Sequence, residues 1–199
     1  LRLHGWNPAP RLRSDADVVV PEWGLVSCAV IYTRRPAAVA RAVVTLEGVE
    51  LAAYREGDAV VVAGRRGSAR ITRCCEAGYS YAAEGVDPLG VADAGIDGAT
   101  CSGCGALCLS GARLREALAA GEYPDAVERL FVHTPDVMVS LEDGWYSGSS
   151  DLASYLRMRG VHGNLRRSGS LGFAMTTLGP LPDNIRIGDL AAELARLRE

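Results

Sequence analysis

The sequence predicts an α/β layer that carries a small antiparallel β-meander. Three observations lead to this expectation. Candidate strands and helices alternate toward the carboxy end, which is typical of α/β proteins. Short apolar segments separated by turn residues cluster in the middle of the chain, which favours hairpins. With 199 residues, 48% apolar and 23% charged, the composition is that of an ordinary globular chain with a real core.

The first part of the chain predicts two strands and a helix. Residues 17–20 and 25–32 are rich in valine, isoleucine and other strand formers, and a Pro-Glu-Trp-Gly break separates them. Pro36 then stands where a helix can begin, because proline suits the first helical turn. Residues 37–46 are rich in helix formers, so we expect a helix there.

The middle of the chain predicts the meander. The expected strands are residues 49–54, 59–63 and 69–73, with a further strand at 79–81. The turns Glu56-Gly57-Asp58 and Arg65-Arg66-Gly67 separate the first three at hairpin spacing. We therefore expect a β-rich insertion over residues 49–84.

The rest of the chain changes character twice. Residues 85–112 are rich in glycine and alanine with little periodicity, which predicts a Gly/Cys-rich loop. Beyond it the expected helices are 112–120, 124–131 and 187–197, and the expected strands are 136–141 and 171–176. A polar loop, residues 142–150, follows the first of these strands.

Charge and hydropathy exclude several classes of protein. The net charge of −3 and a pI near 5.7 give no broad basic surface, so we expect no binding to nucleic acid. All 21 cationic residues are arginine. No apolar run approaches the roughly 18 residues of a membrane helix, and no signal-peptide pattern is visible, so we expect a cytoplasmic location. The chain also begins without methionine, which favours a processed or incomplete chain. The oligomeric state stays open.

The cysteines offer a possible structural zinc site. Cys101, Cys104 and Cys108 form a C-x2-C-x3-C pattern, and Cys74 or Cys75 could supply a fourth thiolate. Without a secretory signal, reduced thiols or a metal site are expected rather than disulfides. The alternative is a set of small, partly buried thiols in an irregular loop.

The segment Gly160-Val161-His162-Gly163-Asn164 is the most suggestive of chemistry. A histidine between two glycines lies on backbone that can turn sharply and approach a ligand closely. Imidazole is a common zinc ligand, so His162 is a candidate metal ligand. The alternative is a structural histidine in a turn.

Four segments resemble the closing region of alkaline phosphatase-like phosphodiesterases, which include the type I phosphodiesterase and nucleotide pyrophosphatase group. These segments are residues 123–126, 135–140, 161–165 and 180–194. The family has a Gly-x-His-Gly turn like the one at His162, and a terminal helix that opens much as Ile187-Gly188-Asp189 does. Residues 48–71 are similar to a β-rich insertion of bacterial members.

The resemblance implies a metal-dependent hydrolase of phosphodiesters or nucleotide-like pyrophosphates. Such enzymes use two divalent metals, usually zinc, and a Thr or Ser nucleophile. His162 would be one metal ligand. Arg166 and Arg167 lie close behind it in the sequence, where a guanidinium could bind the phosphate of a small-molecule ester.

The chain departs from the family in ways that leave a second interpretation open. The Asp-His dipeptide that supplies a ligand to each metal is absent, and no nucleophile pattern is recognisable, so the catalytic residues are unknown. Of the other histidines, His4 is near a terminus and His133 adjoins a buried strand. We therefore expect an incomplete, carboxy-terminal portion of an alkaline phosphatase-like domain over residues 1–199. The alternative is a non-catalytic protein-binding module with a structural zinc held by cysteines.

Overall fold

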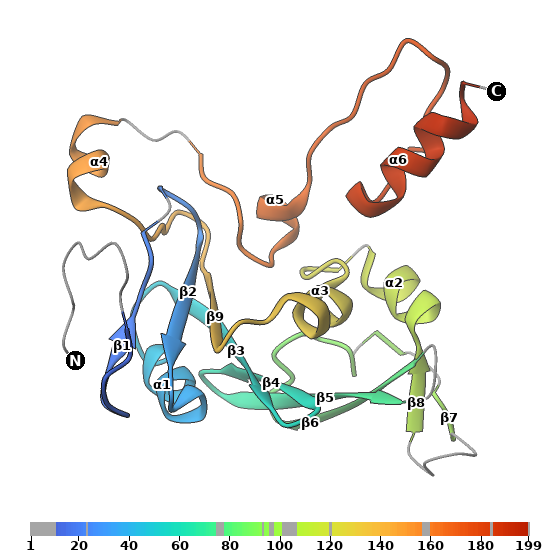
Figure 1. The fold of residues 1–199 in the computed structure, drawn as a ribbon. Helices are drawn as coiled ribbons and strands as arrows, with labels where there is room; N and C mark the ends of the chain where they lie inside the picture. Colours follow the sequence, from blue (N-terminus) through green and yellow to red (C-terminus); the bar gives the residue numbers. More distant parts are fainter. Residues whose placement is uncertain are drawn as a thin grey trace.

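The computed structural model describes residues 11–22, 24–74, 78–92, 94–95, 98–100, 107–119, 121–156, 160–183 and 185–198. These residues contain a nine-stranded sheet in the order β1-β2-β9-β3-β4-β5-β6-β8-β7 (Figure 1). The strands are β1 Val18–Val19, β2 Cys28–Thr33, β3 Val49–Glu56, β4 Ala59–Gly64, β5 Gly67–Cys74, β6 Gly78–Gly85, β7 Ala99–Thr100, β8 Leu107–Ser110 and β9 Val137–Leu141. The helices are α1 Pro36–Val43, α2 Gly111–Ala119, α3 Ala126–His133, α4 Ser150–Tyr155, α5 Arg167–Ser170 and α6 Ile187–Arg196.

The expected α/β layer, alkaline phosphatase-like or otherwise, is wrong. Each strand of the described sheet pairs antiparallel with its neighbours. Strand β9 lies between β2 and β3 and is antiparallel to both, so β2 and β3 run in the same direction without touching. The β2-α1-β3 unit is therefore a split crossover whose gap is filled from far along the chain. Alternation of strands and helices alone could not reveal this insertion.

The meander strands are present, but they belong to the main sheet. Strands β3 to β6 pair consecutively at the expected turns, and β3 also pairs with β9. The segment expected to be a loop contains the short strands β7 and β8, which extend the sheet beyond β6. The strand expected at residues 171–176 is absent from the structure, which has no regular element there.

Two apolar cores lie on the two faces of the sheet. Strand β3 shows the division, because Leu51 and Ala53 belong to one core and Ala52 and Tyr54 to the other. Helices α2 and α3 cover the first core, to which Leu130 contributes, whereas α1 covers the second. The central strands are thus buried on both sides, as their nearly continuous apolar sequences require.

The chain after β9 is organised differently. It continues through α4 and α5 and an extended stretch that stands away from the sheet before α6 (Figure 1). Helices α4, α5 and α6 contain no buried residue. Phe173 is 89% exposed and Ile187 is 88% exposed. Arg186, just before α6, forms ion pairs with Asp125 at 2.6 Å and with Glu128 at 3.3 Å, which link this end of the chain to α3.

Candidate functional site

The turn that carries His162 is fixed through its backbone. The amide of Ser27 donates a hydrogen bond to the carbonyl of His162 at 3.0 Å, and the amide of Gly163 donates to the carbonyl of Gly169 at 3.3 Å. Gly163 has a φ of +112°, a conformation that side chains with a Cβ rarely adopt, so glycine is required here. The imidazole itself is exposed. The chain therefore positions His162 without using its side chain for packing.

Asn164 is the buried anchor of this turn. Its side chain is 1% exposed, and Nδ2 donates to the carbonyl of Leu141 at 3.2 Å and to Oδ1 of Asp143 at 3.0 Å. Its backbone amide donates to Oγ of Ser27 at 3.2 Å. The amide of Leu165 donates to Oγ of Ser140 at 3.0 Å. These bonds attach the turn to the start of β2 and to the end of β9.

A hollow of about 360 Å³ opens beside the turn. Its walls come from the start of β2, the loop after β9 and the turn itself, and the lining residues are Ser27, Asp143, Gly144, Tyr146, Gly160, Val161 and Asn164. A hollow of this volume can hold a phosphate-sized group with its substituents. The His162 side chain lies next to these residues in the sequence but is not itself part of the lining.

Asp143 is the acidic group of the hollow. Hydrogen bonds from the Ser168 hydroxyl, at 2.9 Å to each carboxylate oxygen, and from Asn164 lower the pKa of Asp143. The positive charge of Arg166, 3.9 Å away, acts in the same direction. Asp143 is therefore held in its charged form, which is the form that accepts hydrogen bonds or binds a cation.

Arg166 is surrounded by carboxylates. Its guanidinium contacts Glu50 at 2.5 Å and Glu122 at 2.6 Å, and the Tyr123 hydroxyl also donates to Glu50 at 2.7 Å. The side chain of Glu50 is only 9% exposed, and its second oxygen, Oε2, is buried without a hydrogen-bond partner among the described residues. The hydrogen bond to Glu50 raises the pKa of Arg166, while burial and the bond to Glu50 raise the pKa of Tyr123.

Arg167 is bonded to the main chain. Its amide donates to the carbonyl of Glu122 at 2.7 Å, and its guanidinium donates to the carbonyl of Ala119. Arg166 and Arg167 thus connect the segment after the turn to the region that follows α2. Phosphate binding by these two arginines stays a prediction, and their observed partners are carboxylates and carbonyls.

The predicted metal ligands are not gathered into a site within the described residues. No group of three or more His, Cys, Asp or Glu side chains that could hold a metal is found among them. Cys75, Cys101 and Cys104 lie outside the described residues, as does His4. Cys74 and Cys108 are joined to each other in a disulfide. The described residues therefore do not by themselves fit a two-zinc centre, and a zinc ligand role for His162 stays a prediction.

Sequence reasoning identified the turn but missed the residues that hold it. Asn164 directly follows the Gly-x-His-Gly turn in the sequence, and an amide side chain at that position is a local signal for an anchoring residue. Asp143 followed a buried strand and preceded a glycine, a position where polar side chains often face a ligand. Glu50 gave no signal, because its partner Arg166 lies 116 residues away in the sequence.

Comparisons with known proteins return no match among family models, curated proteins or solved structures. Within the part of the chain that the structure describes, none of the helices has the length and apolar character needed to cross a membrane.

Proposed function

We propose that this chain contributes the His162 turn to the metal site of a phosphate-ester hydrolase acting on phosphodiesters or nucleotide-like pyrophosphates. The observation that carries the proposal is the exposed imidazole on a turn whose backbone is fixed by hydrogen bonds from Ser27 and Gly163. A side chain with no packing role on a well-anchored turn is available for binding. The charged Asp143 lines the hollow beside the turn and supplies an acidic group there.

The metal-binding part of this proposal requires groups beyond the described residues. One imidazole cannot hold two ions, so the remaining ligands and the nucleophile would come from elsewhere, and we assign no catalytic step to this chain. We expect the 199-residue chain alone not to hydrolyse bis(4-nitrophenyl) phosphate above a metal-only control. Zinc-dependent turnover by this chain, abolished by a chelator and restored by metal, would contradict that expectation.

The proposal is tested by His162→Ala in the complete gene product. Loss of a metal ligand removes charge stabilisation worth several kcal/mol, so hydrolysis of bis(4-nitrophenyl) phosphate should fall by about 100-fold or more. Zinc content, measured by mass spectrometry of the metal, should fall in the same samples. The control is His4→Ala, which changes an imidazole outside the turn. Unchanged zinc content and turnover in His162→Ala would exclude the proposed role.

A second candidate function, binding of another protein, is favoured by one observation. Of the fourteen exposed large apolar side chains among the described residues, ten lie between residues 145 and 187. Apolar side chains left exposed along one segment are typical of segments that another protein covers. The cysteine-held zinc belongs to this alternative. If the 199-residue chain binds one zinc that Cys101→Ser with Cys104→Ser removes, while His162→Ala leaves it in place, the alternative gains and the hydrolase proposal loses.

A cytoplasmic location also stays a proposal. The Cys74–Cys108 disulfide bears on it, because stable disulfides are uncommon in reducing compartments. A bond of this kind in the cytoplasm would be expected to open and close with the redox state.

A further inference from the structure

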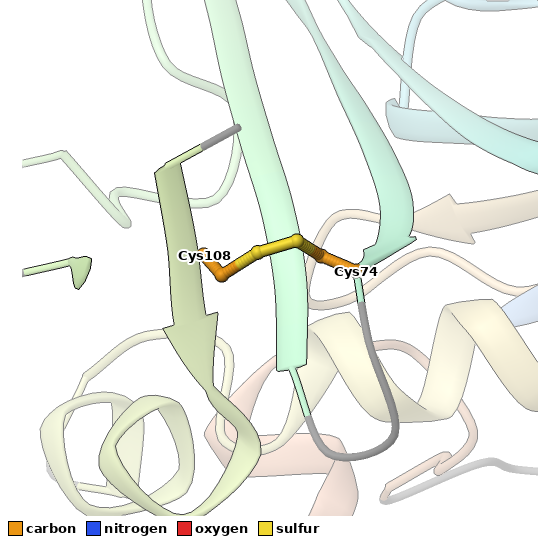
Figure 2. Close-up of a disulfide and its surroundings, with 2 residues drawn as sticks. All are labelled: Cys74 and Cys108. Carbon is orange, nitrogen blue, oxygen red and sulfur yellow. A yellow bond between two sulfur atoms is a disulfide. The ribbon is translucent and has the colours of Figure 1, made fainter. Parts of the chain in front are cut away.

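The Cys74–Cys108 disulfide joins two strands that are not neighbours. Cys74 is the last residue of β5 and Cys108 lies in β8, and Figure 2 shows the bond crossing the intervening strand. That strand is β6, whose first residue, Gly78, pairs with Cys74 on one side and Ser110 on the other. A Cβ at Gly78 would lie 3.1 Å from the carbonyl oxygen of Leu109 and 3.7 Å from Cβ of Cys108. Glycine at this position therefore lets the backbones of β6 and β8 approach each other closely.

Strand β8 forms few backbone pairs with the described strands, and its Leu109 is buried in the first core. It pairs with β6 through two residue pairs only, Gly78 with Ser110 and Tyr79 with Leu109, whereas β5 and β6 pair along eight. Beyond them, β8 pairs only with the two-residue strand β7 among the described strands. The two cysteines are 34 residues apart in the sequence, and a covalent bond that closes such a loop strongly restricts the separation of its two ends. The disulfide and the buried Leu109 are thus the main attachments of β8 to the sheet.

Helix α2 is joined directly to the end of β8. It begins at Gly111, directly after the last residue of β8, so a displacement of β8 acts on the start of the helix. Leu114 and Leu118 of α2 are buried in the core that α3 also covers. Loosening of β8 would therefore be transmitted to the helix and to the residues just after it.

The segment after α2 is hydrogen-bonded to the segment after the His162 turn. Arg167 donates to the carbonyls of Ala119 and Glu122, and Arg166 forms an ion pair with the Glu122 side chain at 2.6 Å. Arg166 follows Asn164, the buried anchor of the turn, by two residues. The contacts therefore run without interruption from the disulfide through β8 and α2 to the turn.

We propose that the redox state of Cys74 and Cys108 controls the anchoring of the His162 turn. In the oxidised form the disulfide holds β8 and α2 against the sheet. A dithiol reductant supplies two electrons and two protons, the S–S bond breaks, two thiols form, and the dithiol becomes a disulfide. The released β8 then lets α2 and the residues around Glu122 open more often, which weakens the contacts of Arg166 and Arg167. This inference concerns the turn itself and holds whether or not the proposed hydrolase function is right.

Hydrogen–deuterium exchange of the 199-residue chain, with and without dithiothreitol, tests this coupling. On reduction, exchange should become about tenfold faster over residues 111–119, 121–123 and 160–170, because local opening is then less costly. Strands β2, β3 and β9 should change by less than twofold. The double variant Cys74→Ala with Cys108→Ala should exchange like the reduced protein and should not respond to dithiothreitol. Cys28→Ser, which leaves the disulfide in place, should respond like the wild type.

Three outcomes would overturn the proposal. Faster exchange confined to residues 107–119, with no change at 160–170, would show that the disulfide does not reach the turn. Equal exchange in the oxidised and reduced protein would show that the bond does not hold α2. Peptide mapping of the unreduced protein that finds no Cys74–Cys108 link would remove its basis. If the double variant does not fold, the wild-type comparison alone decides between these results.

Discussion

The central strands and the segment after β9 are held in place by different forces. The side chains of Val60 and Val62 in β4 and of Ile71 in β5 are completely buried. These strands are therefore stabilised by the removal of apolar surface from water. Between residues 160 and 170 only Leu165 enters the core, and the rest of the segment is held mainly by hydrogen bonds to Ser27, Ser140 and Asp143. Apolar contacts tolerate small shifts of many atoms, whereas each polar bond depends on one partner. The local stability of the region that presents His162 should therefore depend on single polar side chains, whereas the stability of the central strands should not.

The largest expected effect comes from the core. Leu130 of α3 is completely buried, so Leu130→Ala should lower the free energy of unfolding by about 3 kcal/mol through lost burial and a residual cavity. Val132 of the same helix is 52% exposed, and Val132→Ala should change stability by less than about 0.5 kcal/mol. Urea denaturation measures both. Similar losses for the two variants would mean that α3 does not pack against the sheet as described.

The next largest effect is expected in the ion-pair network around Arg166. Arg166→Ala leaves the buried carboxylate of Glu50 without its charged partner, and should cost about 2 kcal/mol, below the range for fully buried pairs because Arg166 is partly exposed. Adding Glu50→Gln should recover part of this loss by removing the unpaired charge. Arg196→Ala, which breaks an exposed ion pair with Glu193, is the control and should have no measurable effect. An Arg166→Ala variant as stable as the wild type would show that the Arg166–Glu50 network does not contribute to the stability of the fold.

A smaller effect is expected at the anchor of the turn. Asn164→Ala removes the hydrogen bonds to Leu141 and Asp143 and leaves a buried carbonyl without its donor, which should cost about 1–2 kcal/mol. Hydrogen exchange over residues 160–170 should rise while exchange in β3 to β5 stays constant. Ser168→Ala removes only an exposed bond to Asp143 and serves as the milder comparison. Equal changes in the sheet and in the turn would contradict the separation of the two regions.

The smallest expected effect is on the pH dependence of stability, through Asp143. The pKa of Asp143 is lowered in the folded protein, chiefly by hydrogen bonds from Ser168 and Asn164. Its contribution to stability is therefore complete above the ordinary aspartate pKa of about 4 and is lost as the pH falls through the lowered value. Asp143→Asn should flatten this part of the stability profile below about pH 4. A steeper profile in that variant would mean that the sign of the shift is wrong.

The sequence allowed some of these features to be predicted because they are local. The meander follows from alternating apolar residues and turn residues at hairpin spacing, and the helices beginning at Pro36 and Ile187 follow from their first-turn residues and apolar spacing. The sheet order could not be predicted, because β9 pairs with β2 and β3 through contacts more than eighty residues apart in the chain. The prediction of a strand at residues 171–176 was wrong, because its apolar residues, Phe173 among them, have no strand to pair with in the structure.

The site was predictable only in part for the same reason. His162 was identified by the glycines on either side of it, which is a local pattern. Its anchors are Ser27, 137 residues from Asn164, and Ser140, 25 residues from Leu165, and neither carries a recognisable motif. Arg166 was expected to be available to phosphate because its distant partners, Glu50 and Glu122, could not be seen from the sequence. Burial and partnership of charged groups depend on the completed fold.

The most direct test of the account measures stability and metal content in the same His162→Ala sample of the complete gene product. Because the turn is anchored through its backbone and Asn164, the free energy of unfolding of the metal-free protein should stay within about 0.5 kcal/mol of the wild type. Zinc content should fall at the same time. A variant that is destabilised by more than about 2 kcal/mol but keeps its zinc would show instead that His162 is a structural residue of the turn, and would contradict the account.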